Sequence, residues 1–127
     1  MTHIVTRAFA ATAFVATSAL AAPTEMYTPA LYANPPQFLE CRIVNVSGAA
    51  QTVTIEAFMS TGAVGAGPST QTLAPGEAGG FSVPGYYANL YCKFTVPGKS
   101  SGYRVSIDVL ELDPVSSTKI VVALPGF

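Results

Sequence analysis

The sequence predicts an all-β fold: an immunoglobulin-like antiparallel β-sandwich of about seven strands, preceded by a cleaved signal peptide. Short runs rich in β-branched and aromatic residues alternate with turn residues at fairly regular intervals. The dipeptide Pro-Gly recurs between them, in LAPGE, VPGYY, TVPGK and ALPGF. Each Pro-Gly signals a type II turn, because Pro presets the first central φ and Gly supplies the positive φ of the second. No ten-residue window has a helical period.

Residues 1–21 have the layout of a secretory signal peptide. One positive charge, Arg7, precedes an uncharged run from Ala8 to Ala22 that is rich in Ala, Phe and Val. Ala19 and Ala21 supply the small residues that a signal peptidase reads, so we expect cleavage after Ala21. The run is too short to span a bilayer comfortably, which predicts no stable membrane insertion. We expect bacterial export to the periplasm or the exterior.

The charges that remain after cleavage exclude several classes of function. Five lysines and arginines then stand against seven aspartates and glutamates, a net charge of −2 with no basic cluster. A nucleic-acid binder needs a basic patch, so we expect no nucleic-acid partner. Cleavage also removes His3, the only histidine. Catalytic triads, Cys-His dyads and the common copper and zinc sites need an imidazole, so we expect none of them and no cofactor.

The chain divides into an arm and one domain. Residues 22–37 predict an irregular Pro/Tyr-rich arm, because MYTPALYANPPQ has three prolines, two tyrosines and no period. Residues 38–127 predict the β-sandwich domain, which at this size has one modest core. Its expected strands are 38–47, 51–60, 69–74, 79–84, 88–97, 103–112 and 117–124.

Alternation of apolar and polar residues predicts a hairpin between the strands 88–97 and 103–112. Setting Val96 opposite Tyr103 places only apolar and aromatic side chains on one face, Cys92 among them. The other face then carries Tyr91 opposite Asp108 and is expected to face solvent.

A second hairpin is expected between the strands 38–47 and 51–60. Setting Ile43 opposite Ile55 places Cys41 on the apolar face. On the outer face, Arg42 then meets Glu56 as an exposed cross-strand ion pair.

The two cysteines predict a disulfide between Cys41 and Cys92. Both lie on apolar strand faces, and in an exported protein two buried cysteines of one core are expected to be oxidised. The alternative is a reactive thiol at Cys92 activated by the adjacent Lys93. Alternation turns Lys93 to the opposite face, so the sequence favours the disulfide.

The best functional lead is a cluster of exposed tyrosines. Tyr87, Asn89 and Tyr91 fall on the solvent side of the strand 88–97, next to Lys93 and Asp108. Such tyrosines with adjacent amides and charges are typical of interfaces and of sugar-stacking surfaces. We therefore expect a non-catalytic protein that binds a protein or a glycan through this face. The alternative is that the tyrosines only cover a sheet edge or pack under the arm.

Two other functions stay open. The first is a structural subunit of a cell-surface assembly that grows by strand addition. The second, more remote, is a hydrolase using Glu111 and Asp113, which share one face at a strand end. The same pair could offer calcium two oxygens, but calcium needs six or more and no Asp/Asn/Gly loop is present, so no metal site is expected.

The segments FLECRIVNVSG, TLAPGEA, YCKFTV and RVSIDV, behind an Ala-rich leader, resemble small exported bacterial proteins of uncharacterised activity. The resemblance covers about residues 38–124 and implies a disulfide-stapled β-sandwich and an exported location. It does not extend to the immunoglobulin fold proper, because the chain has no tryptophan and carries Leu90 where a tyrosine would stand two residues before the second cysteine.

Overall fold

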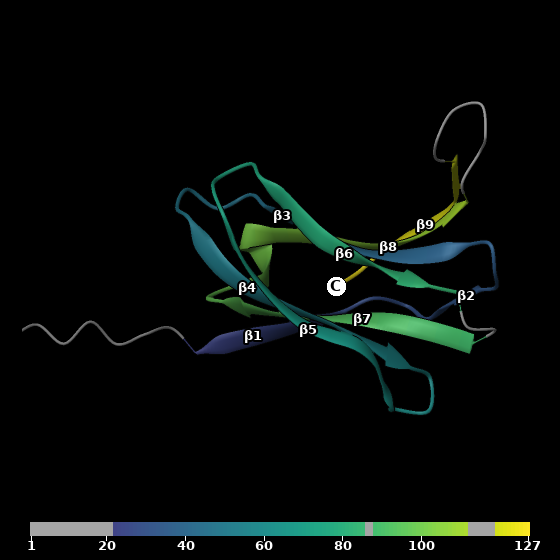
Figure 1. The fold of residues 1–127 in the computed structure, drawn as a ribbon. Helices are drawn as coiled ribbons and strands as arrows, with labels where there is room; N and C mark the ends of the chain where they lie inside the picture. The colour runs from purple at the N-terminus through teal and green to yellow at the C-terminus, as the bar shows by residue number, and fades with distance from the viewer. Residues whose placement is uncertain (1–21, 86–87, 112–118) are drawn as a thin grey trace, which may run out of the picture.

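The computed structural model describes residues 22–85, 88–111 and 119–127. The signal peptide expected over residues 1–21 therefore lies outside the described residues. Of the expected pair of carboxylates, Glu111 is described and Asp113 is not. Within these ranges the chain forms nine strands and one short 3-10 helix, Ser100–Gly102 (Figure 1). The strands are β1 Pro23–Tyr27, β2 Leu31–Ala33, β3 Phe38–Asn45, β4 Gln51–Met59, β5 Val64–Leu73, β6 Ala78–Pro84, β7 Ala88–Pro97, β8 Tyr103–Glu111 and β9 Lys119–Pro125.

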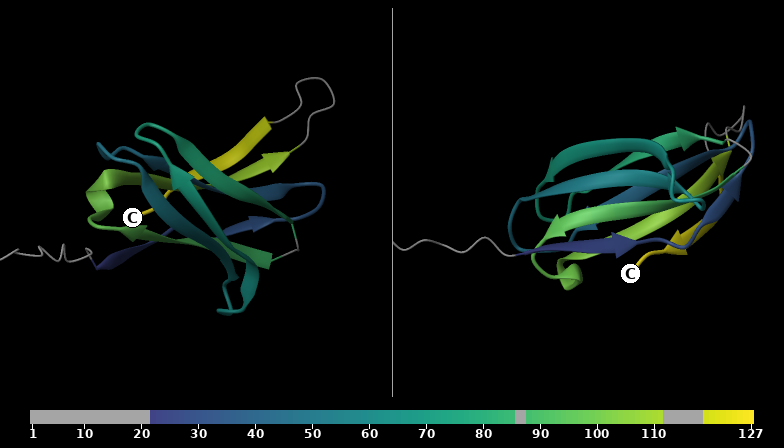
Figure 2. Two further views of the ribbon diagram at one scale, coloured as in Figure 1. Left: turned by 60° about the vertical axis from the view of Figure 1, so that its left-hand side comes forward. Right: turned by 90° about the horizontal axis from the view of Figure 1, so that it is seen from below.

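The strands form two antiparallel sheets packed face to face, so the predicted β-sandwich is confirmed (Figure 2). The first sheet has the order β1-β7-β4-β5, with β2 also paired to β7, and the second has the order β6-β3-β8-β9. The seven expected runs correspond to β3 through β9. The consecutive strands β7 and β8 lie in different sheets, and the last two strands, β8 and β9, pair within the second sheet.

The expected irregular arm is wrong, because its residues form an edge strand of the first sheet. Both β1 and β2 pair antiparallel with β7, through Tyr27 opposite Lys93 and Leu31 opposite Leu90. The arm thus advances four residues while β7 advances three, which is the signature of a β-bulge. Pro29 interrupts the alternation at this bulge, and that interruption hid the strand from sequence analysis.

Both expected hairpins are wrong in partner and right in face. β3 and β4 lie in opposite sheets, as do β7 and β8. Arg42 accordingly does not meet Glu56; its guanidinium lies 3.3 Å from Glu40 and 3.7 Å from Asp108. Cys41 and Cys92 nevertheless point into the core as expected, because alternation determines the face of a residue and leaves its partner strand open.

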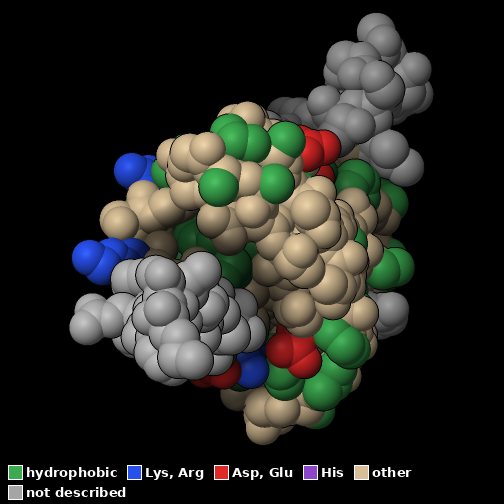
Figure 3. Space-filling view, turned by 90° about the vertical axis from the view of Figure 1, so that its left-hand side faces the viewer, with side chains coloured by type: hydrophobic (Ala, Val, Ile, Leu, Met, Phe, Trp, Pro, Cys, Tyr) green, Lys and Arg blue, Asp and Glu red, His purple; other side chains and the backbone are tan. Residues whose placement is uncertain are grey.

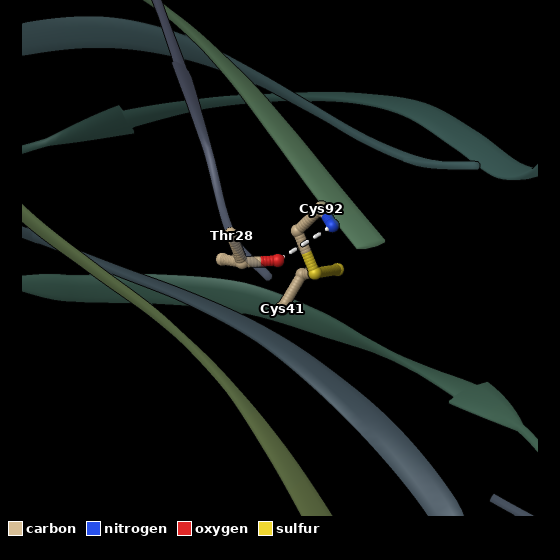
Figure 4. Close-up of a disulfide and its surroundings, with 3 residues drawn as sticks. All are labelled: Thr28, Cys41 and Cys92. Carbon is tan, nitrogen blue, oxygen red and sulfur yellow. Dashed lines mark hydrogen bonds between the residues drawn. A yellow bond between two sulfur atoms is a disulfide. The ribbon is translucent and has the colours of Figure 1, made fainter. Parts of the chain in front are cut away.

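The core lies between the sheets and is crossed by the predicted disulfide, which is confirmed. Cys41 on β3 and Cys92 on β7 are bonded, with their Cα atoms 5.8 Å apart, and both are buried. Thr28, in the bulge of the arm, points its hydroxyl toward this bridge and accepts a hydrogen bond from the Cys92 N–H at 2.9 Å (Figure 4). The arm is therefore fastened next to the disulfide.

Hydrogen bonds between the sheets close both sides of the sandwich. On one side, the Gln71 amide of β5 pairs with both backbone groups of Gly80 on the edge strand β6, at 2.9 and 3.0 Å. On the other side, the chain after β9 ends beside β1 (Figure 2), where Tyr27 and Phe127 exchange two backbone hydrogen bonds. Each contact satisfies backbone groups that an edge strand otherwise exposes.

Asn45 fastens the two loops at one end of the sandwich. Its side chain is fully buried and donates to the carbonyls of Ala49 and Leu73, each at 2.9 Å. Its carbonyl oxygen accepts from the N–H and the hydroxyl of Ser47. Figure 3 shows this side of the molecule, where charged side chains are few and scattered over its visible described residues.

Candidate functional site: the outer face of the first sheet

Three aromatic side chains lie on neighbouring strands of the first sheet and point away from the core. Tyr27 of β1 packs against Tyr91 of β7 with ring centroids 6.3 Å apart, and Tyr91 stacks on Phe58 of β4 at 5.7 Å. Tyr27 is 40% exposed, whereas Tyr91 and Phe58 are half-buried against each other. We call these three residues the aromatic row. Alternation explains their direction, since Met26 and Cys92 beside them face inward.

A charged row runs beside the aromatic row. Lys93 of β7 lies 3.1 Å from Glu25 of β1 and 3.6 Å from Glu56 of β4. The Tyr27 hydroxyl also donates to Glu25, at 2.7 Å. The Lys93 ammonium stands 6.0 Å from the centre of the Phe58 ring. Two carboxylates thus flank one ammonium, so the charged row keeps an excess of negative charge.

These contacts shift the protonation of the row. Hydrogen bonds from Tyr27 and from Lys93, and then the charge of Lys93, lower the pKa of the Glu25 carboxyl. The hydrogen bond between Lys93 and Glu25 raises the pKa of the Lys93 ammonium. The hydrogen bond that Tyr27 donates to Glu25 raises the pKa of the Tyr27 phenol. All three groups therefore keep their neutral-pH charge states over a wider range of pH than they would alone.

Threonine hydroxyls cover the part of the face beyond the charged row. Thr52 lies 3.0 Å from Thr72, and Thr54 lies 3.3 Å from Thr70, measured between the Oγ1 atoms of β4 and β5. Thr95 of β7 is the direct neighbour of Thr54 on the other side. Hydroxyls of this kind both donate and accept, so they suit a ligand rich in hydroxyl groups.

Three of the five residues expected to bind lie together on the outer side of β7. Asn89 is exposed, and Tyr91 and Lys93 are half-buried next to the rows just described. Tyr87 lies outside the described residues. Asp108 is misplaced by the prediction: it belongs to β8 in the opposite sheet, is buried, and faces Arg42. The wrong hairpin partner of β7 caused this error.

Sequence analysis missed three contributors to this face. Tyr27 and Tyr32 come from the supposed arm, and Phe58 comes from a strand whose outer face was assigned to an ion pair with β3. Tyr32 is 51% exposed and pairs with Asn89, so it extends the face along β7. The outward-facing Glu25 and Tyr27 alternate with the buried Met26 and Thr28, and this short alternation was the sequence signal of the arm strand.

The alternative chemistries gain no residues in the described part of the chain. Glu111 ends β8, and its expected companion Asp113 lies outside the described residues. Groups of three or more potential metal ligands are absent from the described residues. These residues also contain no helix with the length and hydrophobicity that a membrane crossing needs.

Comparisons with known proteins support the fold and carry no activity. No family model matches the chain, and no curated protein matches it, in agreement with a resemblance that names no family of known activity. A solved structure, Thermotoga maritima 1070, is similar with a TM-score of 0.55 at 8% identity. That similarity covers 81% of this chain and 91% of the other. At such low identity the likeness concerns the fold alone.

Proposed function

We propose that this chain is an exported, non-catalytic binding protein that engages a protein or a glycan through the outer face of its first sheet. The observation that carries the proposal is the aromatic row. Tyr27, Tyr91 and Phe58 pack together on the side of the sheet that faces solvent, where no packing of the core requires them. Tyrosines are enriched at interfaces, and contiguous exposed apolar patches mark interaction sites, which supports a binding role for this face.

Export rests on the leader and on the disulfide. A bond between Cys41 and Cys92 persists in oxidising compartments and is rare in the reducing cytosol. The intact mass of the protein purified from its native source tests this part: a chain that begins near Ala22 supports export, and a chain that retains residues 1–21 contradicts it.

The hydrogen bonds at the sheet edges favour a binding protein over a subunit that polymerises by strand addition. Strand addition needs an edge with free backbone groups. Gln71 occupies those of Gly80 on β6, and Phe127 occupies those of Tyr27 on β1. A monomer by light scattering at high concentration supports this choice, whereas polymers that grow with concentration contradict it.

Crosslinking in the native cell envelope tests the face itself. A photoreactive side chain placed at Tyr32, beside the aromatic row, should capture the ligand. The variants Tyr91→Ala and Phe58→Ala should abolish the capture, because each removes one ring of the stacked pair. The matched control is Val46→Ala, which removes an exposed hydrophobic side chain that follows β3 of the opposite sheet. Capture that survives both ring substitutions contradicts the proposal.

A further inference from the structure

Phe127 adds a fourth ring to the aromatic row. Tyr27 donates to the Phe127 carbonyl at 2.9 Å and accepts from the Phe127 N–H at 3.0 Å. Residues that exchange both bonds stand directly opposite each other in an antiparallel pair, with their side chains on the same face. Gly126 faces the other way, since a Cβ there would lie 2.5 Å from Val105 Cγ2 inside the sandwich. Phe127 therefore points outward next to Tyr27, and it is 85% exposed.

The extended row crosses the sheet with one side chain from each of β1, β7, β4 and β5, and Phe127 precedes them beside β1. It runs from Phe127 through Tyr27 and Tyr91 to Phe58, and Val64 stands opposite Phe58 on β5 with 60% exposure. Four steps between neighbouring strands give a length of about 19 Å. The charged row borders it on one side, and the exposed Tyr32 and Asn89 continue the face on the other side.

This shape suits a linear polymer better than a protein surface. A stable protein interface covers about 800 Å² on each partner with some 20 to 30 residues, and it surrounds its apolar centre with a wide rim. A narrow row of rings instead matches a chain of pyranose units, each of which offers an apolar C–H face for stacking. The two cavities of about 440 and 510 Å³ lie elsewhere, around Pro35 and Pro84 and around Glu40 and Arg42.

The charges and hydroxyls of the face favour a neutral ligand. Lys93 is already paired with Glu25 and Glu56, and the two carboxylates outnumber it, so an anionic polymer finds no free counter-charge in this row. Hydroxyl groups are plentiful, in the paired threonines of β4 and β5. The exposed Asn89 amide adds a donor and an acceptor beside Tyr32.

We propose that the ligand is a neutral polysaccharide that lies across the strands on Phe127, Tyr27, Tyr91 and Phe58, with Phe127 as the outermost stacking position. This inference rests on the proposed function, since it names the ligand class of the same face.

Retention on insoluble polysaccharides tests the inference. The full chain after its leader is incubated with cellulose, chitin, curdlan and starch granules, and the protein left in solution is measured. We expect retention on at least one of the four, unchanged by added salt because no charge is involved. Phe127→Ala and Tyr91→Ala should each weaken the retention about tenfold, as one lost stacking contact predicts. Val46→Ala should leave it unchanged.

Gly126→Ala tests whether the position of the Phe127 ring matters, since this substitution leaves the ring itself in the chain. The added methyl group collides with Val105 and with the Tyr27 carbonyl, so the tail must move while every ring stays in the chain. Retention should fall as it does in Phe127→Ala. Far-UV circular dichroism and the intact disulfide verify folding, and Phe127→Ala keeps the test valid if Gly126→Ala proves unstable, because Phe127 is exposed.

The outcomes separate this inference from the proposed function. If none of the four polymers retains the protein while envelope crosslinking beside the aromatic row succeeds, the ligand is not a neutral polysaccharide and the proposed function stands. If neither occurs, both fail. Retention that both ring substitutions leave unchanged, or retention that added salt abolishes, also overturns the inference.

Discussion

Removing the disulfide should cost this domain a large part of its stability. The variant Cys41→Ala/Cys92→Ala releases a closed loop of 51 residues. In the chain-entropy model such a loop contributes about 4 kcal/mol, an upper estimate because native strain usually reduces it. Domains of this size are stable by only about 5–15 kcal/mol, so the loss should be a large share of the total.

Urea unfolding followed by far-UV circular dichroism measures this loss. The unfolding midpoint of the double variant should fall sharply, and its m-value should rise, because the unfolded chain without the bond exposes more surface. Wild-type protein reduced with a phosphine is the matched control, since it loses the bond and keeps both sulfur atoms. The reduced protein and the double variant should unfold at similar midpoints. A loss below about 1 kcal/mol would refute the assignment of the bond as the main constraint on the unfolded chain.

Three smaller perturbations test the contacts around the bridge and the sheet edges. Thr28→Val leaves the buried Cys92 N–H without an acceptor and should destabilise the domain by about 1–3 kcal/mol in thermal unfolding, whereas Thr28→Ser should lose much less. Gln71→Ala frees the backbone of Gly80 and should cause association that grows with concentration in light scattering; Gln71→Glu, which keeps only an acceptor, should do so partly. Glu25→Gln should destabilise the protein at neutral pH and lose its effect in acid. The folded pKa of this carboxyl is lowered, so its stabilisation is complete above the ordinary glutamate value and disappears as the pH falls through the folded value. An equal effect of this substitution at pH 7 and pH 3 would contradict that linkage.

The fold was predictable from the sequence as far as periodicity reaches. Alternation identified β3 through β9 and turned both cysteines inward, which was enough to predict the disulfide. Alternation could not identify strand partners. A strand turns the same side chains toward the core whether the next strand of the sequence pairs with it or lies in the opposite sheet. Adjacent strands often pair, but here the short connections β3–β4 and β7–β8, among others, cross between the sheets instead of turning back within one.

The candidate site was predictable only along a single strand. Asn89, Tyr91 and Lys93 were placed on one face of β7 by alternation alone, and they share that face. Residues from other strands depended on the register, so Asp108 was assigned wrongly and Phe58 was overlooked. Phe127 depended on a contact between the two ends of the described chain, about which local patterns carry no information.

The segment after β9 links stability to the proposed binding face. The two hydrogen bonds with Tyr27 close one side of the sandwich, and the same two bonds direct the Phe127 ring outward beside Tyr27. Phe127 has almost no packing of its own, with 85% exposure, so its ring adds little to the core. The backbone of this residue therefore has a structural role that any residue except proline can perform, whereas its aromatic side chain is exposed for the contact proposed above. A substitution such as Phe127→Ala should consequently separate the two roles: the midpoint of unfolding should stay within a few tenths of a kcal/mol of wild type, as for an exposed site, while binding to the aromatic row weakens.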